Sequence, residues 1–414
     1  MCGSEQSAAG VGGETGGFAL FPAWHTAWSP RGETMHGSRS ETPRILIADD
    51  QPDLLDALQL LLKGEGMQME AVTSPDAALA ALSSCAYDLL LMDLNYTGDT
   101  TSGTEGMDLL SRVQAVDSSL PVVVMTGWGS VDLAVETMRR GVRDFVQKPW
   151  DNAQLLATIR AEIAGGRARR QQAEDTKREM EEARRIQRKL LPSAVPQIDG
   201  CEIASQWRPA EGVGGDCYDL IPFGPSRVAL CIADVVGKGI PAALLMSNLQ
   251  AAVRAFATDA AQPAELCQQV NRILCGRIAE GRFISFFYGK VDTALGVLTY
   301  SNAGHYLPIV IREDGAVSRL GEGGPVLGVC GDAEYEQGHT PIASGDRIVL
   351  FTDGVTEARN EADEEFGEER LIAAAIANRA CSAPAIEARL SACVSAFTGG
   401  GLQDDATMIV VAMD

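Results

Sequence analysis

The sequence lacks the features that mark several large classes of protein. No apolar run in its 414 residues approaches the roughly 18 residues that a membrane-spanning helix needs. The first residues contain no positively charged segment leading into an apolar one, so we expect no signal peptide. Basic residues are outnumbered, and the net charge of −22 argues against nucleic acid or an acidic membrane surface as the main partner.

Cysteine pairs at metal-binding or redox spacing are also missing. The chain has ten cysteines but no C-x-x-C pair. Several of them, including Cys85, Cys231 and Cys267, lie inside apolar runs. This pattern predicts reduced, buried thiols in a cytoplasmic protein rather than a disulfide framework.

The chain is long enough for two folded domains. Its length and a hydrophobic content of 46% allow two substantial cores. Residues 1–42 differ from the rest, because they are rich in Gly, Ser and Thr and show no hydrophobic period. We expect them to form a disordered leader, with docking of Trp24 or Trp28 as the alternative.

Residues 43–164 alternate short apolar runs with helical stretches. This order predicts an α/β doubly wound fold with a five-stranded parallel sheet, whose functional residues lie at the carboxyl ends of the strands. The predicted strands are Ile45–Ala48, Met69–Val72, Asp88–Met92, Val122–Met125 and Asp144–Gln147, and the predicted helices are Asp53–Lys63, Pro75–Leu82, Glu105–Ala115, Ser130–Arg139 and Asn152–Ala164.

Five polar residues are expected on one rim of that sheet. Asp50 and Asp93 can share one Mg²⁺, and Asp93 can attack a phosphoryl donor as a carboxylate nucleophile. A hydroxyl and an amine on the same rim can then hold phosphoryl oxygens. In chain order the five are Asp49 and Asp50 after the first strand, Asp93 at the end of the third, Thr126 after the fourth and Lys148 after the fifth.

This arrangement resembles the receiver domain of two-component response regulators. The resemblance implies that Asp49 and Asp50 form the acidic pair of a Mg²⁺ site that Asp93 and the backbone carbonyl of Asn95 complete. It also implies that Asp93 is the phosphoacceptor for a sensor histidine kinase.

The same resemblance assigns the residues that respond to phosphorylation. Thr126 corresponds to the switch hydroxyl, Phe145 to the switch aromatic, and Lys148-Pro149 to a conserved cis peptide beside the phosphoryl group. The loop Leu94–Thr104 departs from the family, because it is longer and lacks the common Pro-Gly pair. The phosphoryl lifetime and the choice of kinase therefore stay open.

Residues 165–191 have the composition of a charged helix, with no Gly or Pro between Gly165-Gly166 and Pro192. We expect the glycine pair to break the last receiver helix or to act as a hinge. Six residues recur at alternating spacings of three and four along this helix. This seam predicts a short parallel coiled coil that forms a homodimer and relays the receiver state. The alternative is a single solvated helix that spaces the domains. The seam consists of Ala173, Thr176, Met180, Ala183, Gln187 and Leu190.

Residues 192–414 contain mostly predicted strands together with four helices, which indicates an α+β sandwich of two sheets flanked by helices. The stretch Glu211–Gly239 is its centre. Two apolar segments there, Tyr218–Phe223 and Arg227–Ala233, predict a hairpin with a Gly-Pro-Ser turn. The hairpin would place Asp216 and Asp234 side by side.

Further carboxylates adjoin later apolar runs, at Asp353 and at the pair Asp404-Asp405. If these acids converge on Asp216 and Asp234, they repel one another strongly. Hard divalent cations relieve such repulsion, because Mg²⁺ and Mn²⁺ prefer carboxylate and water oxygens. The pattern therefore predicts a binuclear metal centre.

Six motifs in this half occur in an order that resembles the SpoIIE-like branch of the metal-dependent PPM phosphatases, which are related to the type-2C serine/threonine phosphatases. The resemblance covers roughly residues 186–414. The motifs are Gly214–Asp219, Asp234–Gly239, Asn302–His305, Thr352–Glu357, Phe366-Gly367 with Arg370-Leu371, and Asp404–Thr407.

The resemblance assigns roles in catalysis. Asp234 would bridge two Mn²⁺ or Mg²⁺ ions, Asp216 and the carbonyl of Val235 would hold the second, and Asp353 and Asp404 would hold the first. A water activated between the ions would attack phosphorus in line, without a covalent enzyme intermediate.

Two further residues, Asp405 and Lys238, keep open assignments. Asp405 either supports the site from behind Asp404 or is itself the ligand. Lys238 stands where the family often has His, and it either neutralises nearby carboxylates, touches the substrate phosphate or is a solvated turn residue.

Together the two resemblances predict a response regulator whose output is a phosphoserine/phosphothreonine phosphatase. The second implies a small phosphoprotein substrate, an anti-sigma-factor antagonist of the STAS type. The alternative is a phosphorylation-controlled binding adaptor with little or no phosphatase activity. The direction of control by Asp93 is not encoded in any motif of the sequence.

Overall fold

The computed structural model describes residues 42–96, 104–127, 142–210, 212–278 and 281–414. The predicted leader, with Trp24 and Trp28, and the predicted helix Ser130–Arg139 lie outside these residues. The chain forms two compact units, which divide between Arg169 and Arg170. Each unit is described by itself.

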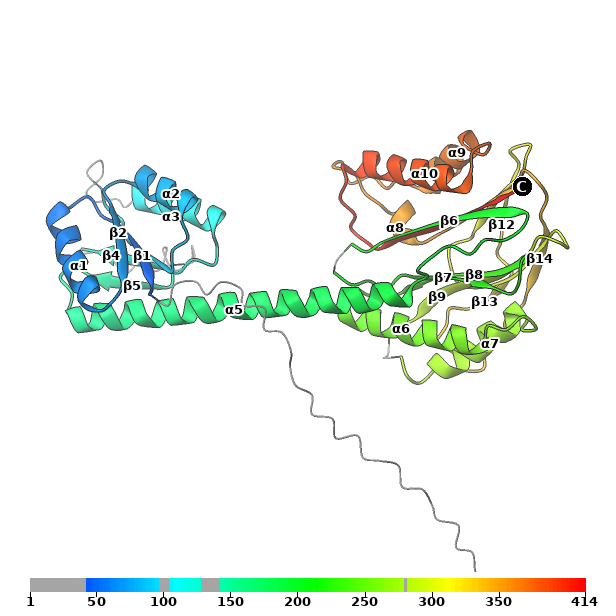
Figure 1. Cartoon of the computed structure of the whole chain (residues 1–414), viewed down its shortest axis with the longest axis horizontal. Helices are drawn as coiled ribbons and strands as arrows, with labels where there is room; N and C mark the ends of the chain where they lie inside the picture. The colour runs from blue at the N-terminus through cyan, green and yellow to red at the C-terminus, as the bar shows by residue number, and fades with distance from the viewer. Residues whose placement is uncertain (1–41, 97–103, 128–141, 211, 279–280) are drawn as a thin grey trace, which may run out of the picture. The chain divides into compact units, whose positions relative to one another are not determined.

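The first unit contains the predicted five-stranded parallel sheet, with strand order β2-β1-β3-β4-β5 (Figure 1). Apolar clusters cover both faces of this sheet, as a parallel sheet requires. Its strands are β1 (Arg44–Ala48), β2 (Gln68–Val72), β3 (Leu89–Asp93), β4 (Val122–Thr126) and β5 (Asp144–Gln147), and the described helices before α5 are α1 (Pro52–Gly64), α2 (Pro75–Ser84) and α3 (Thr104–Val116).

Local signals in the sequence explain where the helices begin. Proline occupies the first turn of both α1 and α2, where its missing N–H costs no hydrogen bond. Ser74 caps α2, because its hydroxyl accepts a hydrogen bond from the N–H of Ala77 at 3.3 Å.

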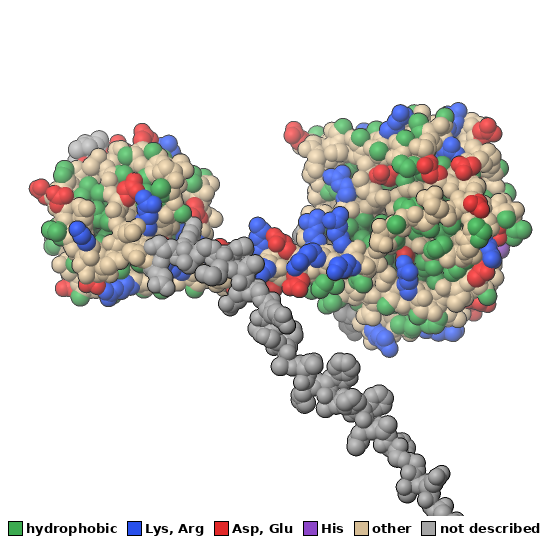
Figure 2. Space-filling model, in the orientation of Figure 1, with side chains coloured by type: hydrophobic (Ala, Val, Ile, Leu, Met, Phe, Trp, Pro, Cys, Tyr) green, Lys and Arg blue, Asp and Glu red, His purple; other side chains and the backbone are tan. Residues whose placement is uncertain are grey.

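Helix α5 (Asn152–Leu190) does not break at Gly165-Gly166, so the predicted break was wrong. The second glycine serves close packing, because a Cβ on Gly166 would lie 2.5 Å from the ring of Pro121. The helix is then largely solvated from Gln171 to Glu179. Acidic and basic side chains alternate along this part of its surface (Figure 2).

The second unit is a sandwich of two mostly antiparallel sheets with helices outside each (Figure 1). One sheet has the order β13-β10-β9-β8-β7, with β14 also on β10, and the other has the order β12-β11-β15-β16-β6. Helices α6 and α7 pack on the first sheet, and α9 and α10 pack on the second. The predicted hairpin is confirmed, since β7 and β8 pair antiparallel.

The bounds of the elements of the second unit are as follows. The first sheet contains β7 (Cys217–Pro222), β8 (Arg227–Val235), β9 (Ile284–Asp292), β10 (Val297–Ala303), β13 (Gly323–Gly324) and β14 (Gly338–Pro341). The second contains β6 (Cys201–Arg208), β11 (Ile309–Ile311), β12 (Val317–Arg319), β15 (Arg347–Phe351) and β16 (Ala406–Met413). The helices are α6 (Gly239–Phe256), α7 (Pro263–Leu274), α8 (Asp353–Thr356), α9 (Glu368–Ala377) and α10 (Ala383–Thr398).

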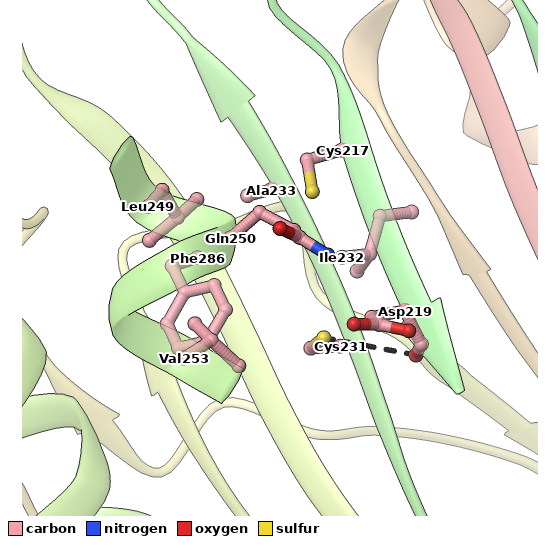
Figure 3. A pocket seen from close by; sticks show the side chains of 9 residues that line it. All are labelled: Cys217, Asp219, Cys231, Ile232, Ala233, Leu249, Gln250, Val253 and Phe286. Carbon is pink, nitrogen blue, oxygen red and sulfur yellow. Dashed lines mark hydrogen bonds between the residues drawn. The ribbon is translucent and has the colours of Figure 1, made fainter. Parts of the chain in front are cut away.

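Cys231 and Cys267 are buried as predicted, whereas Cys85 is only partly buried, and every cysteine in the described ranges is free. Figure 3 shows a small cavity between the hairpin and α6, lined by Cys217 and Cys231 among others. Burial raises the pKa of both thiols, so they stay protonated and act as core residues. The described helices include none that is both long and apolar enough to cross a bilayer.

Candidate metal centres

The rim of the parallel sheet gathers the predicted receiver residues. Asp49 and Asp50 follow β1 and Asp93 ends β3, which is the neighbouring strand. One carboxylate oxygen from each of the three lies within 4.8 Å of the others. Such a group of hard oxygen donors fits a single divalent cation.

Lys148 holds two of these carboxylates together. Its ammonium donates to Asp49 Oδ2 and to Asp93 Oδ2, each at 2.7 Å. Burial acts to lower the pKa of Lys148, but the two carboxylate partners outweigh it and raise that pKa. Asp49 is fully buried, and burial raises its pKa despite the lysine.

Of the remaining receiver residues, Thr126 lies on the same rim, whereas Phe145 pairs with Val124, two residues before the end of β4. Thr126 ends β4, and its carbonyl accepts a hydrogen bond from the Lys148 N–H at 2.6 Å. The Lys148-Pro149 peptide is cis, as the resemblance implied. Phe145 on β5 is 41% exposed. The backbone N–H of Asn95 donates to Asp93 Oδ1 at 3.3 Å, so Asn95 lies beside the acceptor.

In the second unit the hairpin register brings two predicted ligands together. Cys217 pairs with Ala233, so Asp216, which directly precedes β7, lies beside Asp234 of β8 at the same edge. The carbonyl of Val235 lies at this edge too, because a Cβ on Gly215 would be 2.8 Å from that oxygen. Glycine at 215 therefore permits the close approach of the two backbones.

Asp216 is fixed from one side only. Its Oδ2 accepts hydrogen bonds from the hydroxyls of Thr352 and Thr407, at 2.7 and 2.6 Å. Its Oδ1 is buried and has no partner among the described residues. A buried carboxylate oxygen is costly to leave unpaired, so this atom is suited to hold a cation.

The carboxylates of this edge repel one another. Burial, followed by the charges of Asp353 and Asp404, raises the pKa of Asp234 to about 7. Burial, followed by Asp404 and Glu357, raises the pKa of Asp353 to about 6. Burial and the charge of Asp234 also raise the pKa of Asp216. The charges that act on these acids place strand ends far apart in sequence near one another. Within the described residues, no three of these acids bring carboxylate oxygens within 4.8 Å of one another, as the receiver acids do.

The adjacent residues Asp404 and Asp405 make different contacts, which indicate different roles. Asp405 is buried and binds backbone with both oxygens, accepting from the N–H of Ala210 at 2.8 Å and of Gly215 at 2.7 Å. Asp404 is half-exposed, and its carboxylate pairs with Lys238 at 3.0 Å. Lys238 also donates to the carbonyl of Gln403 at 2.6 Å. Asp404 is thus available to a ligand, while Asp405 anchors the loop that precedes Asp216.

The sequence did not identify the residues that support these acids. Thr352 and Thr407 stood within the quoted motifs, but nothing in their spacing showed that both hydroxyls reach Asp216. Trp207 was missed as well, and its indole N–H donates to the Asp216 carbonyl at 3.2 Å. His305 is buried beside Ser285, with 2.8 Å between Nδ1 and Oγ, and burial lowers its pKa to about 4.

Comparison with protein families agrees with this geometry. Residues 45–160 match the response regulator receiver domain, and residues 224–414 match the stage II sporulation protein E (SpoIIE) family. The first unit thus matches the receiver family, and the second matches the SpoIIE family over most of its length. Asp234, Asp353 and Asp404 lie inside the second match, and Asp216 precedes it.

Individual relatives show the same division. Phosphoserine phosphatase RsbU of Bacillus subtilis is 35% identical over 189 residues, which is 45% of this chain and 56% of RsbU. Transcriptional regulatory protein FixJ of Bradyrhizobium diazoefficiens is 34% identical over 119 residues, 29% of this chain and 56% of FixJ. The chain thus spans about half the length of these curated relatives.

A solved structure supports the fold of the second unit. The SiaA-PP2C domain of Pseudomonas aeruginosa superposes with a TM-score of 0.52 at 21% identity. The match covers 58% of this chain and 98% of that domain. At this identity the likeness establishes the PP2C-type fold and nothing about the substrate.

Proposed function

We propose that this protein is a response regulator phosphorylated on Asp93 whose second unit is a metal-dependent phosphoserine/phosphothreonine protein phosphatase. The observation that supports it best is Asp216, a buried carboxylate with one oxygen held by two threonines and the other bare. It lies near acids whose pKa values are raised by burial and then by one another's charge.

The residues present fit divalent cations. Their donors are carboxylate and carbonyl oxygens, which suit Mn²⁺ or Mg²⁺. In this proposal Asp234 bridges two ions, Asp216 and the Val235 carbonyl serve one, and Asp353 and Asp404 serve the other. When bound, the ions would offset the negative charge and supply an activated water for hydrolysis.

The chain's own residues do the remaining work. Thr352 and Thr407 orient Asp216, and Asp405 fixes the loop that leads to it. Lys238 places a positive charge beside Asp404, where it can attract a phosphate that the acids would otherwise repel.

Exposed apolar side chains next to the acids favour a protein substrate over a small phosphoester. Ile240 is 50% exposed and lies two residues after Lys238. Phe283 is 37% exposed, and its carbonyl accepts from the N–H of Val236. Tyr306 is 38% exposed and donates to Glu357, the acid that helps to raise the pKa of Asp353.

The partners in this proposal are a sensor histidine kinase, a STAS-type anti-sigma-factor antagonist as substrate, and a second copy of the chain along α5. The receiver triad would take Mg²⁺, with Thr126 and Phe145 responding to phosphorylation and the cytoplasm as the site of action. In the proposed dimer seam Ala173 and Thr176 are exposed, whereas Gln187 is buried against the chain's own second unit.

The test is phosphate release from a phosphorylated STAS protein by the purified full chain with Mn²⁺. The wild type should turn over, and Asp353→Asn should not. Turnover that survives Asp353→Asn would refute the metal assignment. Tight binding of the phosphoprotein without release under any metal would favour the adaptor reading instead. Phosphorylation of the receiver, or Asp93→Asn, should change the rate or the oligomeric state if the two domains are coupled.

A further inference from the structure

Helix α5 carries a buried polar residue near its end. Its side chains are exposed from Gln171 to Glu179, yet Gln187 is only 3% exposed. A glutamine is an unusual residue to bury on a helix face, because its carboxamide has to find partners for both donor and acceptor.

Both partners belong to the backbone of one residue, Gly214, and they are its carbonyl and its N–H. The Gln187 amide nitrogen donates to the Gly214 carbonyl at 2.6 Å, and the Gly214 N–H donates to Gln187 Oε1 at 3.0 Å. This two-way contact fixes which end of the carboxamide is oxygen, because the backbone groups it meets cannot exchange roles.

Gly214 is confined on its other side as well. A Cβ there would lie 2.2 Å from Asp405 Oδ2, and the next N–H, that of Gly215, donates to the same carboxylate. The loop is therefore held between helix α5 and Asp405. Asp216, the residue with the bare buried oxygen, follows two positions later.

The end of α5 has further contacts within the second unit. The Leu190 carbonyl accepts from the Gln250 amide at 2.8 Å, and Gln250 also lines the cavity of Figure 3. Leu191 belongs to the core of the sandwich. Since neighbouring helix positions lie about 100° apart around the axis, a modest rotation of α5 would withdraw Gln187 from Gly214.

We propose that Gln187 is a positioning residue that sets the place of Asp216 through Gly214, and so tunes the metal affinity of the site from helix α5. This rests on the proposed phosphatase function of the site. In this proposal helix α5 controls the site by holding or releasing the loop that contains Gly214 and leads to Asp216. Partners behind a metal ligand typically change metal affinity by about 10- to 100-fold when removed.

The test uses the full chain with Gln187→Met, which keeps the length of the side chain and removes both hydrogen bonds. Gln187→Ala is the second variant, in case methionine disturbs folding. Gln172→Met, on the exposed part of the same helix, is the matched control. Mn²⁺ affinity is measured by calorimetry, turnover by phosphate release, and loop order by amide hydrogen exchange of peptides covering residues 212–218.

At both variants we expect Mn²⁺ affinity about 10-fold weaker or more, with kcat recovering at saturating Mn²⁺ and faster exchange in this loop. The control should match the wild type. Wild-type affinity and exchange in the Gln187 variants would overturn the proposal. If the wild type neither binds Mn²⁺ nor releases phosphate, the phosphatase function fails. The exchange rates then still decide whether Gln187 holds the loop.

Discussion

The two acidic sites of this chain manage the same electrostatic problem in different ways. In the receiver, Lys148 lies between Asp49 and Asp93 and neutralises part of their charge. In the second unit, the described cation that pairs with a site carboxylate is Lys238, and it reaches only the half-exposed Asp404. Burial, together with the charges of neighbouring acids, raises the pKa values of Asp234 and Asp353 to about 7 and 6.

The difference shows how strongly each site depends on a bound metal cation. A rim that already contains a lysine is partly stable without metal and can take one cation. A cluster without an internal counter-charge depends on cations to ionise fully near neutral pH. We therefore expect metal removal to affect the second site more than the first.

The largest effect should come from Asp353→Asn. Losing a proposed metal ligand should lower Mn²⁺-dependent phosphate release by about 100-fold or more, since the removed oxygen can no longer hold the cation. Steady-state phosphate release measures it. Asp314→Asn, an exposed turn residue, is the control and should retain the wild-type rate. Equal rates in both variants would show that Asp353 holds no catalytic metal ion.

A second prediction compares the contributions of Asp404 and Asp405 to stability. Asp405→Ala should lower the free energy of unfolding by about 3 kcal/mol, because the N–H groups of Ala210 and Gly215 lose their partner. Asp404→Ala should change it by less than about 1 kcal/mol, since its ion pair with Lys238 is exposed.

Urea unfolding without metal measures both values, and a Mn²⁺ titration completes the test. Metal affinity should fall at Asp404→Ala although the fold is intact. The reverse pattern, with Asp405 dispensable for stability, would contradict the assignment of the two roles.

The third prediction concerns Lys148. Lys148→Met leaves the buried Asp49 and Asp93 without their counter-charge, which should cost the receiver about 2 kcal/mol in Mg²⁺-free buffer. Mg²⁺ should recover most of that loss, because the cation replaces the lost positive charge. Chemical unfolding with and without Mg²⁺ is the measurement. Stability that is insensitive to Mg²⁺ in this variant would show that the triad holds no cation.

The smallest expected effect is a pH dependence. The raised pKa of Asp234 means that the metal-free folded protein retains a proton that the unfolded chain releases. Its contribution to stability is therefore present below about pH 4 and is lost as pH rises through about 7, by about 1 kcal/mol once solvent screening is allowed for.

Thermal unfolding of the wild type against Asp234→Asn measures this contribution together with the repulsion that Asp234 exerts on Asp216. The wild type should lose stability relative to the variant between about pH 4 and 7, and saturating Mn²⁺ should abolish or reverse that trend. A difference that does not vary with pH would show that Asp234 is not repelled by its neighbours.

Much of the fold was predictable, because it follows from local patterns. The five receiver strands lie within one residue of their predicted bounds at each end. The hairpin of β7 and β8 followed from two apolar segments and a Gly-Pro-Ser turn. Strand-end position was enough to anticipate that Asp49, Asp93 and Lys148 meet, since carboxyl ends of parallel strands share one edge.

Other features depended on contacts between distant segments. Gly165-Gly166 predicted a break by propensity alone, but packing of Gly166 against Pro121 keeps the helix continuous. Asp404 and Asp405 are identical in type and adjacent, so only their surroundings distinguish them.

The sequence by itself determined the order of the two folds, the strands of the parallel sheet and the hairpin of the second unit. Periodicity, turn residues and strand ends are local properties, and they need no tertiary contact to be read. Only the tertiary structure decided which oxygen of Asp216 is held and which is bare, and which of two neighbouring aspartates faces inward. It alone placed Gln187 against Gly214, because hydrogen bonds between residues 27 apart in sequence form only after the helix and the loop have packed together.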